Sequence, residues 1–444
     1  MINPIYILLF ISMLSLANSH AQALPHTIEW QNSIGGSDNE IARSIIPTSD
    51  SGYILTGWSS SNDGDISGNQ GNQDCGVVKL NSNGEILWQK SLGGSHSDLG
   101  YSIKSDFDGG YIVAGLTSSN DGDVSGNHGN QDCWIVKLNG DGEILWQRAL
   151  GGSWEDLGYS IQTTSDNGYV IAGGTSSNDG DVSGHQGNGD FWVIKLNSLG
   201  EIQWQKTMGG SEFDTARSIQ TTQDGGYIVA GLTSSNDGDV SDNNGELDCW
   251  VVKLDINGNI EWQNALGGSE DDSAYSVQQT FDGGYILSGH TASNDGDVTN
   301  NNGSIDYWVV KLNSNGVLQW QKTLGGSSWE NGARSIQQTP DGGYIVAGNT
   351  SSTDGDVTNN NGFADYWVVK LNEIGKIEWQ ESYGGSDYEE AYSIHITSDG
   401  GFIVAGETRS NNGDVSGHNG LSDYWVTKLS SPTLQAAKFI KPII

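Results

Sequence analysis

The chain of 444 residues contains 19 Lys or Arg and 55 Asp or Glu, which gives a net charge of −36 at pH 7. Phosphate-rich partners are bound through Lys and Arg, so this composition excludes nucleic acid as a partner and disfavours anionic membrane surfaces. The 16 tryptophans argue against a disordered chain, and the 64 glycines predict many tight turns.

An uncharged apolar run, residues 5–17, opens the chain, and small and polar residues follow it up to Ala21 and Ala23. This pattern is typical of a secretory signal peptide, which we expect to span residues 1–23. A run of about 13 residues is too short to cross a bilayer, which disfavours an uncleaved anchor. The mature chain is therefore expected to have no transmembrane segment and to be secreted, extracellular or held at the cell surface.

A phrase that contains Trp-Gln and then Gly-Gly-Ser returns seven times between residues 27 and 430. Successive copies are 58 residues apart, except for a last step of 59. A fixed period predicts an array of one supersecondary unit whose copies bury their apolar faces against each other. The seven tryptophans are Trp30, Trp88, Trp146, Trp204, Trp262, Trp320 and Trp379.

Each repeat contains four strand-like segments, which in the second repeat are residues 85–92, 101–105, 111–117 and 132–138. The Trp-Gln segment alternates apolar and polar residues, which predicts a half-exposed strand. The Tyr-Ile-Val-Ala-Gly segment is apolar throughout, which predicts a strand covered on both faces. Asp-Gly-Gly and Asn-Gly sequences predict tight turns between antiparallel neighbours, and no segment has the periodicity of a helix.

These features predict an all-β fold, a seven-bladed β-propeller of four-stranded antiparallel blades over residues 27–430. A β-solenoid is the alternative, but it would need capping repeats of atypical sequence. The array opens with a lone Trp-Gln strand, residues 27–34, so we expect this strand to complete the final blade and close the ring. Residues 431–444 form a short C-terminal tail.

The turn Thr-x-Asp-x-Gly-Tyr-Ile, at residues 48–54, 222–228 and 339–345, is similar to the Asp-box hairpin of sialidase-type propellers. The second repeat departs from it, with Asp106 in place of Thr. The complete repeat, with Asp-Gly-Gly-Tyr-Ile-Val-Ala-Gly and Asp-Tyr-Trp-Val-Val-Lys-Leu, resembles that of secreted bacterial β-propeller proteins. The resemblance implies export, a structural role for the hairpin, and no defined chemistry.

Three cysteines, Cys75, Cys133 and Cys249, occupy equivalent positions of three repeats, where the other repeats have Phe or Tyr. Equivalent positions of neighbouring sheets lie about 10 Å apart, beyond the Cα separation of roughly 7 Å that a disulfide allows. We therefore predict three buried, reduced thiols, with metal binding and intermolecular pairing as the alternatives.

A meander of four strands places the Asp-Gly-Gly and Asn-Gly turns on one rim, and the Gly-Gly-Ser loop and a long acidic loop on the other. The acidic loop contains two aspartates around a glycine, with asparagines nearby. Such oxygens are the ligands that Ca²⁺ prefers, although the EF-hand spacing and its bidentate Glu are absent. Stabilisation of the loop's own turn is the alternative. The candidate calcium ligands are Asp63, Asp65, Asp121, Asp123, Asp179, Asp181, Asp237, Asp239, Asp295, Asp297, Asp354 and Asp356.

Positions at which the repeats differ are the candidates for ligand binding. Between the Gly-Gly-Ser serine and the next acid lie Trp154, Phe213, Trp329 and Tyr388, whose rings could stack on sugars or pack on a neighbouring blade. A second variable position follows the Ala-Gly strand and is expected near the channel. It is held by Trp58, Leu116, Gly174, Leu232, His290, Asn349 and Glu407, with His290 as a further candidate ligand.

An acid follows the Gly-Gly-Ser serine by three residues in every repeat. Paired carboxylates are the catalytic groups of many glycoside hydrolases, but acids in every repeat are explained more simply as acceptors for the adjoining turn. These acids are Glu40, Asp98, Asp156, Asp214, Asp272, Glu330 and Glu389.

The leading interpretation is a secreted, non-catalytic β-propeller, expected to be a monomer, that binds a polymer (a glycan) or a protein through one acidic loop rim. A polysaccharide-active enzyme on a propeller scaffold and a purely structural or adhesive surface protein are the alternatives. A central pocket of unlike, convergent residues would favour the enzyme. Calcium is the candidate cofactor.

Overall fold

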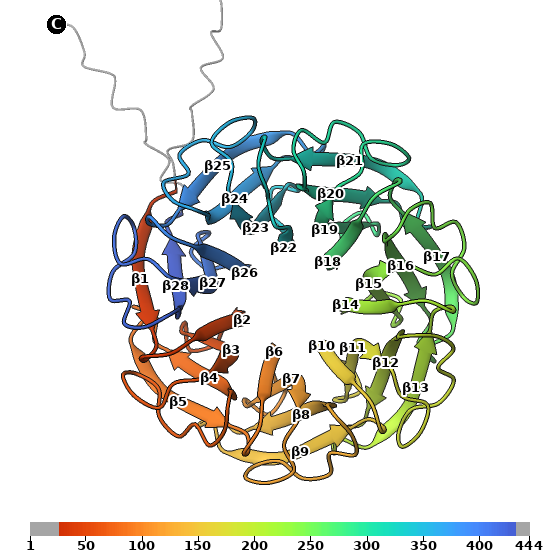
Figure 1. Ribbon diagram of the computed structural model, residues 1–444, viewed down its shortest axis with the longest axis horizontal. Helices are drawn as coiled ribbons and strands as arrows, with labels where there is room; N and C mark the ends of the chain where they lie inside the picture. Colours follow the sequence, from red (N-terminus) through yellow and green to blue (C-terminus); the bar gives the residue numbers. More distant parts are fainter. Residues whose placement is uncertain (1–25, 432–444) are drawn as a thin grey trace, which may run out of the picture.

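The computed structural model describes residues 26–431, so the predicted signal peptide 1–23 and all but the first residue of the predicted tail 431–444 lie outside the described residues. Within them, seven four-stranded sheets form a closed ring around a central channel (Figure 1). The described part of the chain contains no helix, and so none that could span a bilayer. The predicted seven-bladed β-propeller is confirmed, and the solenoid alternative is not favoured.

The strands of the first four blades run from the channel outwards in chain order. Blade 1 contains β2 (Glu40–Pro47), β3 (Tyr53–Ser59), β4 (Asp74–Leu80) and β5 (Ile86–Leu92). Blade 2 contains β6 (Asp98–Ser105), β7 (Tyr111–Thr117), β8 (Asp132–Leu138) and β9 (Ile144–Leu150). Blade 3 contains β10 (Asp156–Thr163), β11 (Tyr169–Thr175), β12 (Asp190–Leu196) and β13 (Ile202–Met208). Blade 4 contains β14 (Asp214–Thr221), β15 (Tyr227–Thr233), β16 (Asp248–Leu254) and β17 (Ile260–Leu266).

The last three blades follow the same order until the ring closes. Blade 5 contains β18 (Asp272–Gln279), β19 (Tyr285–Thr291), β20 (Asp306–Leu312) and β21 (Leu318–Leu324). Blade 6 contains β22 (Ala333–Gln338), β23 (Tyr344–Thr350), β24 (Asp365–Leu371) and β25 (Ile377–Tyr383). Blade 7 contains β26 (Glu389–Ile396), β27 (Phe402–Thr408), β28 (Asp423–Leu429) and, on its outside, β1 (Ile28–Ile34).

Ring closure joins the two ends of the described chain. The strand β1 pairs antiparallel with β28, with Trp30 opposite Lys428 and Ile34 opposite Tyr424. The predicted pairing of residues 27–34 with the last blade is therefore confirmed. Every blade ends on a Trp-Gln strand, so the structural blade begins one strand later than the sequence repeat.

Burial within a blade follows the sequence pattern. The two central strands are buried on both faces, whereas the Trp-Gln strand on the outside is half-exposed. Seven apolar clusters fill the ring, and each is shared by two neighbouring blades. In the cluster between blades 1 and 2, the buried Trp134 packs with Val77, and its indole Nε1 donates to Gln147 Oε1 at 2.9 Å. The predicted alternation is thus confirmed, and the ring is held together mainly by apolar burial between blades.

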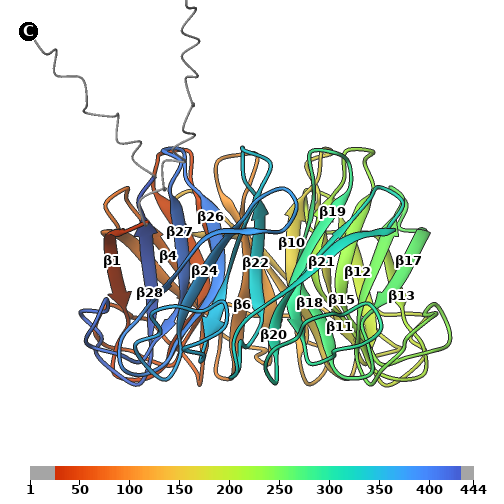
Figure 2. The same cartoon turned by 90° about the horizontal axis from the view of Figure 1, so that it is seen from above.

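The two rims of the ring differ in their loops, as predicted (Figure 2). The loop face consists of the Gly-Gly-Ser loop and the long acidic loop of each blade, which in the first copy are residues 35–39 and 60–73. The turn face consists of the tight turns, residues 48–52 and 81–85 in blade 1.

The Asp-box-like hairpins stabilise the turn face through a repeated ion pair. In blade 1, Gly52 N donates to Asp50 Oδ1 at 3.1 Å, and Lys79 Nζ lies 2.7 Å from Asp50 Oδ2. The hydrogen bond from Lys79 lowers the pKa of Asp50 to about 2. In the second repeat, Asp106 replaces the Thr and contacts Lys137 Nζ at 2.7 Å. Lys79 and Lys137 occupy equivalent positions of their blades, and each is the ion-pair partner of an acid in its own repeat.

The three cysteines are buried and free. Burial raises the pKa of Cys75 to about 12, so its thiol stays protonated and unreactive at neutral pH.

Candidate functional site

The two loops of the loop face are joined by hydrogen bonds to the acidic side chains. Ser95 N donates to Asp121 Oδ1 at 2.7 Å, and Gly93 N donates to Asp123 Oδ2 at 3.2 Å. Asp123 N in turn donates to Gly93 O at 2.8 Å. Both aspartates of this loop therefore act as acceptors that fix the Gly-Gly-Ser turn next to them.

The same contacts recur in the other blades that have both aspartates. The first carboxylate accepts a backbone N–H of the Gly-Gly-Ser loop at 2.7–2.8 Å in Asp63, Asp179, Asp237, Asp295 and Asp354. The carboxylate of the second aspartate lies 3.3–3.4 Å from a glycine N in Asp181, Asp239, Asp297 and Asp356. The backbone N of the second aspartate also donates to a glycine O, as Asp65 N does to Gly35 O. Within residues 26–431, no group of three His, Cys, Asp or Glu side chains is arranged to hold a metal ion. The contacts favour turn stabilisation, and calcium binding stays a prediction.

Three of the four predicted aromatic residues are exposed on the loop face. Trp154, Phe213 and Trp329 have 60%, 45% and 61% of their surface exposed. Tyr388 is half-buried instead, because its OH donates to Glu390 Oε2 at 2.5 Å and the Arg409 guanidinium lies 5.0 Å from its ring centroid. The structure thus separates three free rings from one that belongs to a polar cluster.

His290 lies beside the channel rather than on the exposed rim. Its ring is 5.4 Å from that of Tyr275 on the inner strand of the same blade. Burial, and to a smaller extent Arg334, lowers the pKa of His290 to about 4, so the ring is neutral at neutral pH.

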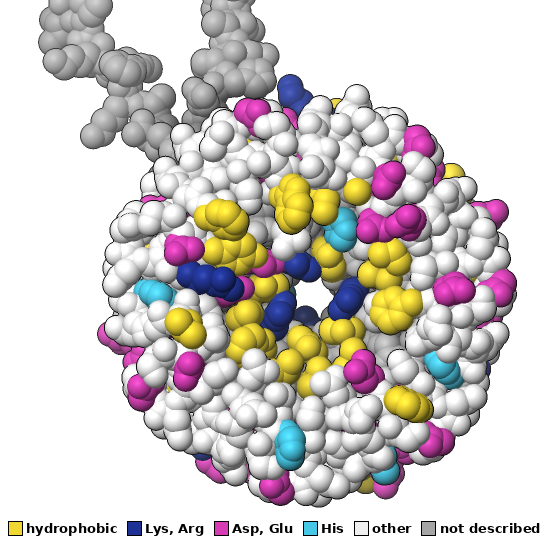
Figure 3. All heavy atoms as spheres, in the orientation of Figure 1, with side chains coloured by type: hydrophobic (Ala, Val, Ile, Leu, Met, Phe, Trp, Pro, Cys, Tyr) yellow, Lys and Arg dark blue, Asp and Glu magenta, His cyan; other side chains and the backbone are white. Residues whose placement is uncertain are grey.

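The inner strand of every blade carries a β-bulge, which the sequence patterns did not predict. The register shifts at one residue, and that residue is Arg or Tyr in all seven blades. A bulge re-aims a side chain out of the ladder, and these seven side chains line a channel cavity of about 310 Å³. They are Arg43, Tyr101, Tyr159, Arg217, Tyr275, Arg334 and Tyr392, which we call the Arg/Tyr ring. Figure 3 shows Lys and Arg side chains around the central opening of the ring, surrounded by hydrophobic ones.

Each arginine of the Arg/Tyr ring stacks on a tyrosine. The guanidinium carbon of Arg43 lies 4.1 Å from the centroid of Tyr392, and that of Arg217 lies 4.3 Å from the centroid of Tyr159. Arg334 lies 4.2 Å from the centroid of Tyr275. Such cation–π contacts are most favourable where water is scarce, so they hold the three cations in the channel.

Next along each inner strand, a serine links one blade to the following one. Ser44 Oγ accepts the N–H of Ile103 at 3.4 Å, and Ser102 Oγ accepts that of Ile161 at 3.3 Å. The same bond occurs at all seven blade junctions. These serines therefore serve ring closure, whereas the Arg/Tyr side chains next to them line the channel.

The mouth of the channel is not symmetric, because polar groups gather beside blades 6 and 7. Glu390 accepts from Arg334 Nε at 2.9 Å and from Tyr392 OH at 2.9 Å, in addition to Tyr388 OH. Glu407, at the second variable position, lies 3.4 Å from both Tyr392 OH and Arg409 Nη2. The prediction that this variable position faces the channel holds for Glu407.

Blade 6 is also where the repeat gains one residue. Gly332 has a φ of 95°, and a Cβ added to it would lie 2.5 Å from the ring of Tyr275. The strand β22 begins at Ala333, whereas the inner strands of the other blades begin at the repeat acid. The 59-residue step in the sequence was the signal of this local change.

At each blade junction, the acid after Gly-Gly-Ser lies beside the aspartate that begins the third strand of the preceding blade. Between blades 1 and 2, Asp98 Oδ2 accepts from Gly94 N at 2.7 Å and Ser119 Oγ at 2.8 Å, while Asp74 Oδ1 has no hydrogen-bond partner. Both carboxyl groups are fully buried. Burial, with a smaller contribution from Asp98, raises the pKa of Asp74 to about 6. The prediction that the repeat acids accept hydrogen bonds from the adjoining turn is confirmed.

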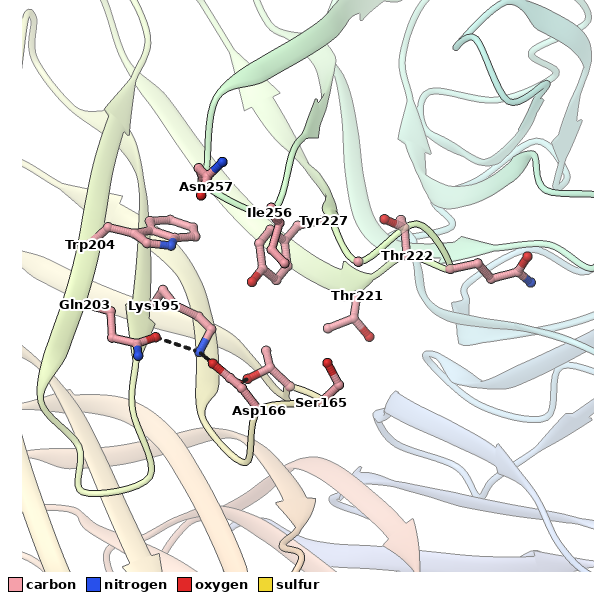
Figure 4. Close-up of a pocket in the computed structure, with 13 residues that line it drawn as sticks. Ser165, Asp166, Lys195, Gln203, Trp204, Thr221, Thr222, Tyr227, Ile256 and Asn257 are labelled. Carbon is pink, nitrogen blue, oxygen red and sulfur yellow. Dashed lines mark hydrogen bonds and ion pairs between the residues drawn. The ribbon is translucent and has the colours of Figure 1, made fainter.

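A second hollow, of about 500 Å³, lies on the turn face between blades 3 and 4 (Figure 4). Lys195 Nζ contacts Asp166 Oδ2 at 2.8 Å and Gln203 Oε1 at 3.0 Å in its wall, and Trp204 packs against Tyr227. The Asp–Lys pair recurs within other blades, and the Trp–Tyr pair recurs between other neighbouring blades. This hollow is therefore part of the repeat architecture rather than a distinct site.

Comparisons with known proteins support the fold rather than a specific ligand. No family model matches the chain. Regulatory protein FlaEY of Caulobacter vibrioides is 24% identical over 211 residues, which cover 44% of this chain and only 22% of that protein.

Among solved structures, the WD40 β-propeller domain of Doa1 aligns with a TM-score of 0.51 at 12% identity, covering 92% of this chain and 98% of that one. The structure of BBS1N in complex with ARL6DN aligns with a TM-score of 0.49 at 10% identity, covering 92% and 97% of the two chains. At 12% identity, the likeness to the Doa1 domain shows the β-propeller fold alone.

Proposed function

We propose that this protein is an exported, non-catalytic binding module that holds a neutral glycan across its loop face. The observation that carries the proposal is the exposure of Trp154, Phe213 and Trp329, at 45–61%, on loops of a rigid ring. The curated relative and the solved structures leave the ligand open, so the proposal rests on this surface.

The chemistry of the loop face suits a carbohydrate. Flat aromatic faces stack on sugar rings at a small cost in side-chain entropy, and the surrounding Asn, Ser and Gly residues offer hydrogen-bonding groups to hydroxyls. The net charge of −36 disfavours anionic polymers. The Gly-Gly-Ser loops are fixed by the acidic side chains beneath them, for example by Ser153 N to Asp179 Oδ1 at 2.8 Å, so the rings are presented on a preorganised surface.

A glycan array, with and without EDTA, tests this proposal directly. We expect the wild-type protein to bind a neutral glycan and the double variant Trp154→Ala/Trp329→Ala to lose that binding. Phe281→Ala is the matched control, because Phe281 is 70% exposed but lies on the turn face. Retention of glycan binding by the double variant, or the capture of proteins and no glycan, would contradict the proposal and favour a protein partner.

The polysaccharide-active enzyme remains a second candidate because unlike residues do converge at the channel mouth. Glu390 and Glu407 both contact Tyr392 OH there. The release of reducing sugar ends from a bound glycan, lost in Glu390→Gln, would replace the binding proposal with the enzyme.

A further inference from the structure

The three arginines of the Arg/Tyr ring differ in whether a carboxylate neutralises them. Arg334 is paired with Glu390, which comes from the following blade, at 2.9 Å. The positions equivalent to Glu390 in the blades that follow Arg43 and Arg217 are Leu99 and Ser273. Two guanidinium groups of the ring therefore have no carboxylate where the third has one.

The hydrogen-bonding capacity of these two arginines is also unused. The Nε atoms of Arg43 and Arg217 are buried and have no partner among residues 26–431. No ion pair joins either side chain to another residue of this described range, although the protein carries a net charge of −36. An unpaired buried N–H of a charged group is costly, and the cation–π contacts with Tyr392 and Tyr159 supply no acceptor for it.

The pairing of Arg334 shows how this channel holds a carboxylate. The two oxygens of Glu390 accept from Arg334 Nε and from the OH groups of Tyr388 and Tyr392, at 2.5–2.9 Å. A guanidinium beside tyrosine hydroxyls is thus a carboxylate-binding unit in this ring. Arg43 and Arg217 reproduce its cationic part, each stacked on a tyrosine in the same way as Arg334.

We propose that the central channel binds a small free carboxylate ligand through Arg43 and Arg217. At each of these two arginines, a ligand carboxylate takes the place that Glu390 takes at Arg334. The channel cavity of about 310 Å³ has the size of a small-molecule site.

Succinate is the probe for a calorimetric titration of the intact protein, at an ionic strength held constant with NaCl. Because a charge-assisted hydrogen bond is lost, we expect Arg43→Gln and Arg217→Gln each to weaken succinate binding by about tenfold or more. Sulfate at the same ionic strength separates a carboxylate site from a general anion site. Equal affinity for sulfate and succinate, or no heat from succinate beyond that of chloride, would overturn the proposal.

Arg148→Gln is the matched control, because Arg148 lies on β9, the outer strand of blade 2, 5.5 Å from the centroid of Trp146. We expect its succinate affinity to equal that of the wild type, and an equal loss in this variant would count against the channel. Arg43→Lys keeps the positive charge and the aliphatic stem but loses the paired N–H donors of the guanidinium group. This variant therefore tests succinate binding if Arg43→Gln fails to fold.

A gain of binding provides an independent test. Glu390→Gln removes the internal carboxylate, so we expect Arg334 to become available and the number of bound succinates to rise by one. An unchanged stoichiometry with an intact fold would contradict the role assigned to Glu390. Trp154→Ala/Trp329→Ala should bind succinate normally, which keeps this inference distinguishable from the glycan proposal.

Discussion

The blade junctions and the channel mouth follow opposite rules. At the junctions, equivalent residues make the same contacts in all seven copies, as the serine hydrogen bonds and the buried carboxyl pairs show. At the mouth the equivalent positions hold Leu99 in one blade and Glu390 in another. Residues that repeat maintain the ring, whereas residues that break the repeat create the chemical differences that a ligand can recognise.

Trp250→Ala and Trp154→Ala place the same substitution in the two kinds of region. Trp250 is fully buried between blades, and its ring centroid lies 4.5 Å from that of Phe191, so its loss should lower the free energy of unfolding by about 3–5 kcal/mol. Trp154 is 60% exposed, and its loss should change that free energy by less than about 0.5 kcal/mol. Denaturant unfolding measures both, and similar losses would remove the distinction.

The buried carboxyl pairs predict that stability falls as the pH rises from about 4 to about 7. Burial raises the pKa to about 6 in Asp74 and to about 7 in Asp365, above the values of an unfolded chain. Such groups hold their proton more tightly when folded, so they stabilise the fold below the unfolded pKa and lose this contribution through the folded pKa. Each pKa unit is worth about 1.4 kcal/mol.

Melting temperatures at pH 5 and pH 8 check this prediction, with the higher value expected at pH 5. The neutral His290 and His395, with pKa values lowered to about 4 and 3, act in the opposite direction. They are outnumbered by six aspartates of the pairs, whose pKa values are raised to about 6 or 7. Asp365→Asn should flatten the dependence, and a protein that is more stable at pH 8 would refute the account.

A serine and an arginine on the inner strands of blades 2 and 4 sharpen the comparison further. Ser102→Ala removes the acceptor of Ile161 N and should cost about 1 kcal/mol in unfolding free energy. Arg217→Gln, at a bulge and without a hydrogen bond, should cost less than Ser102→Ala. Chemical denaturation of the two variants gives the ranking, and the reverse order would assign the Arg/Tyr ring to ring closure.

The smallest effect is expected at the acidic loops. Because Asp121 and Asp123 hold the Gly-Gly-Ser turn, their replacement by Ala should lower the melting temperature slightly, equally with EDTA and with calcium. Calcium and magnesium are compared at equal ionic strength, since salt alone screens the charge of −36. A rise specific to calcium that disappears in the variant would establish the predicted calcium site.

The repeat made the fold predictable, because period, strand pattern and turns all agree. The pairing of Trp30 with the last blade could be predicted since the first strand had no partner in its own repeat. The Arg/Tyr ring was missed even though Arg or Tyr precedes Ser in every repeat. A bulge depends on the ladder register rather than on residue pattern, and the Arg334–Glu390 pair depends on which strands lie innermost.

The strand pairing that completes blade 7 also decides how this molecule can be attached to anything else. Thr27 N donates to Ser430 Oγ at 3.0 Å, so the chain enters and leaves the ring at one spot on the turn face (Figure 2). A fusion, linker or surface tether at either end would attach the ring through its turn face and leave the loop face unobstructed. The same proximity allows the backbone to be cut between any two blades and rejoined at residues 27 and 430, giving seven circular permutants with one architecture.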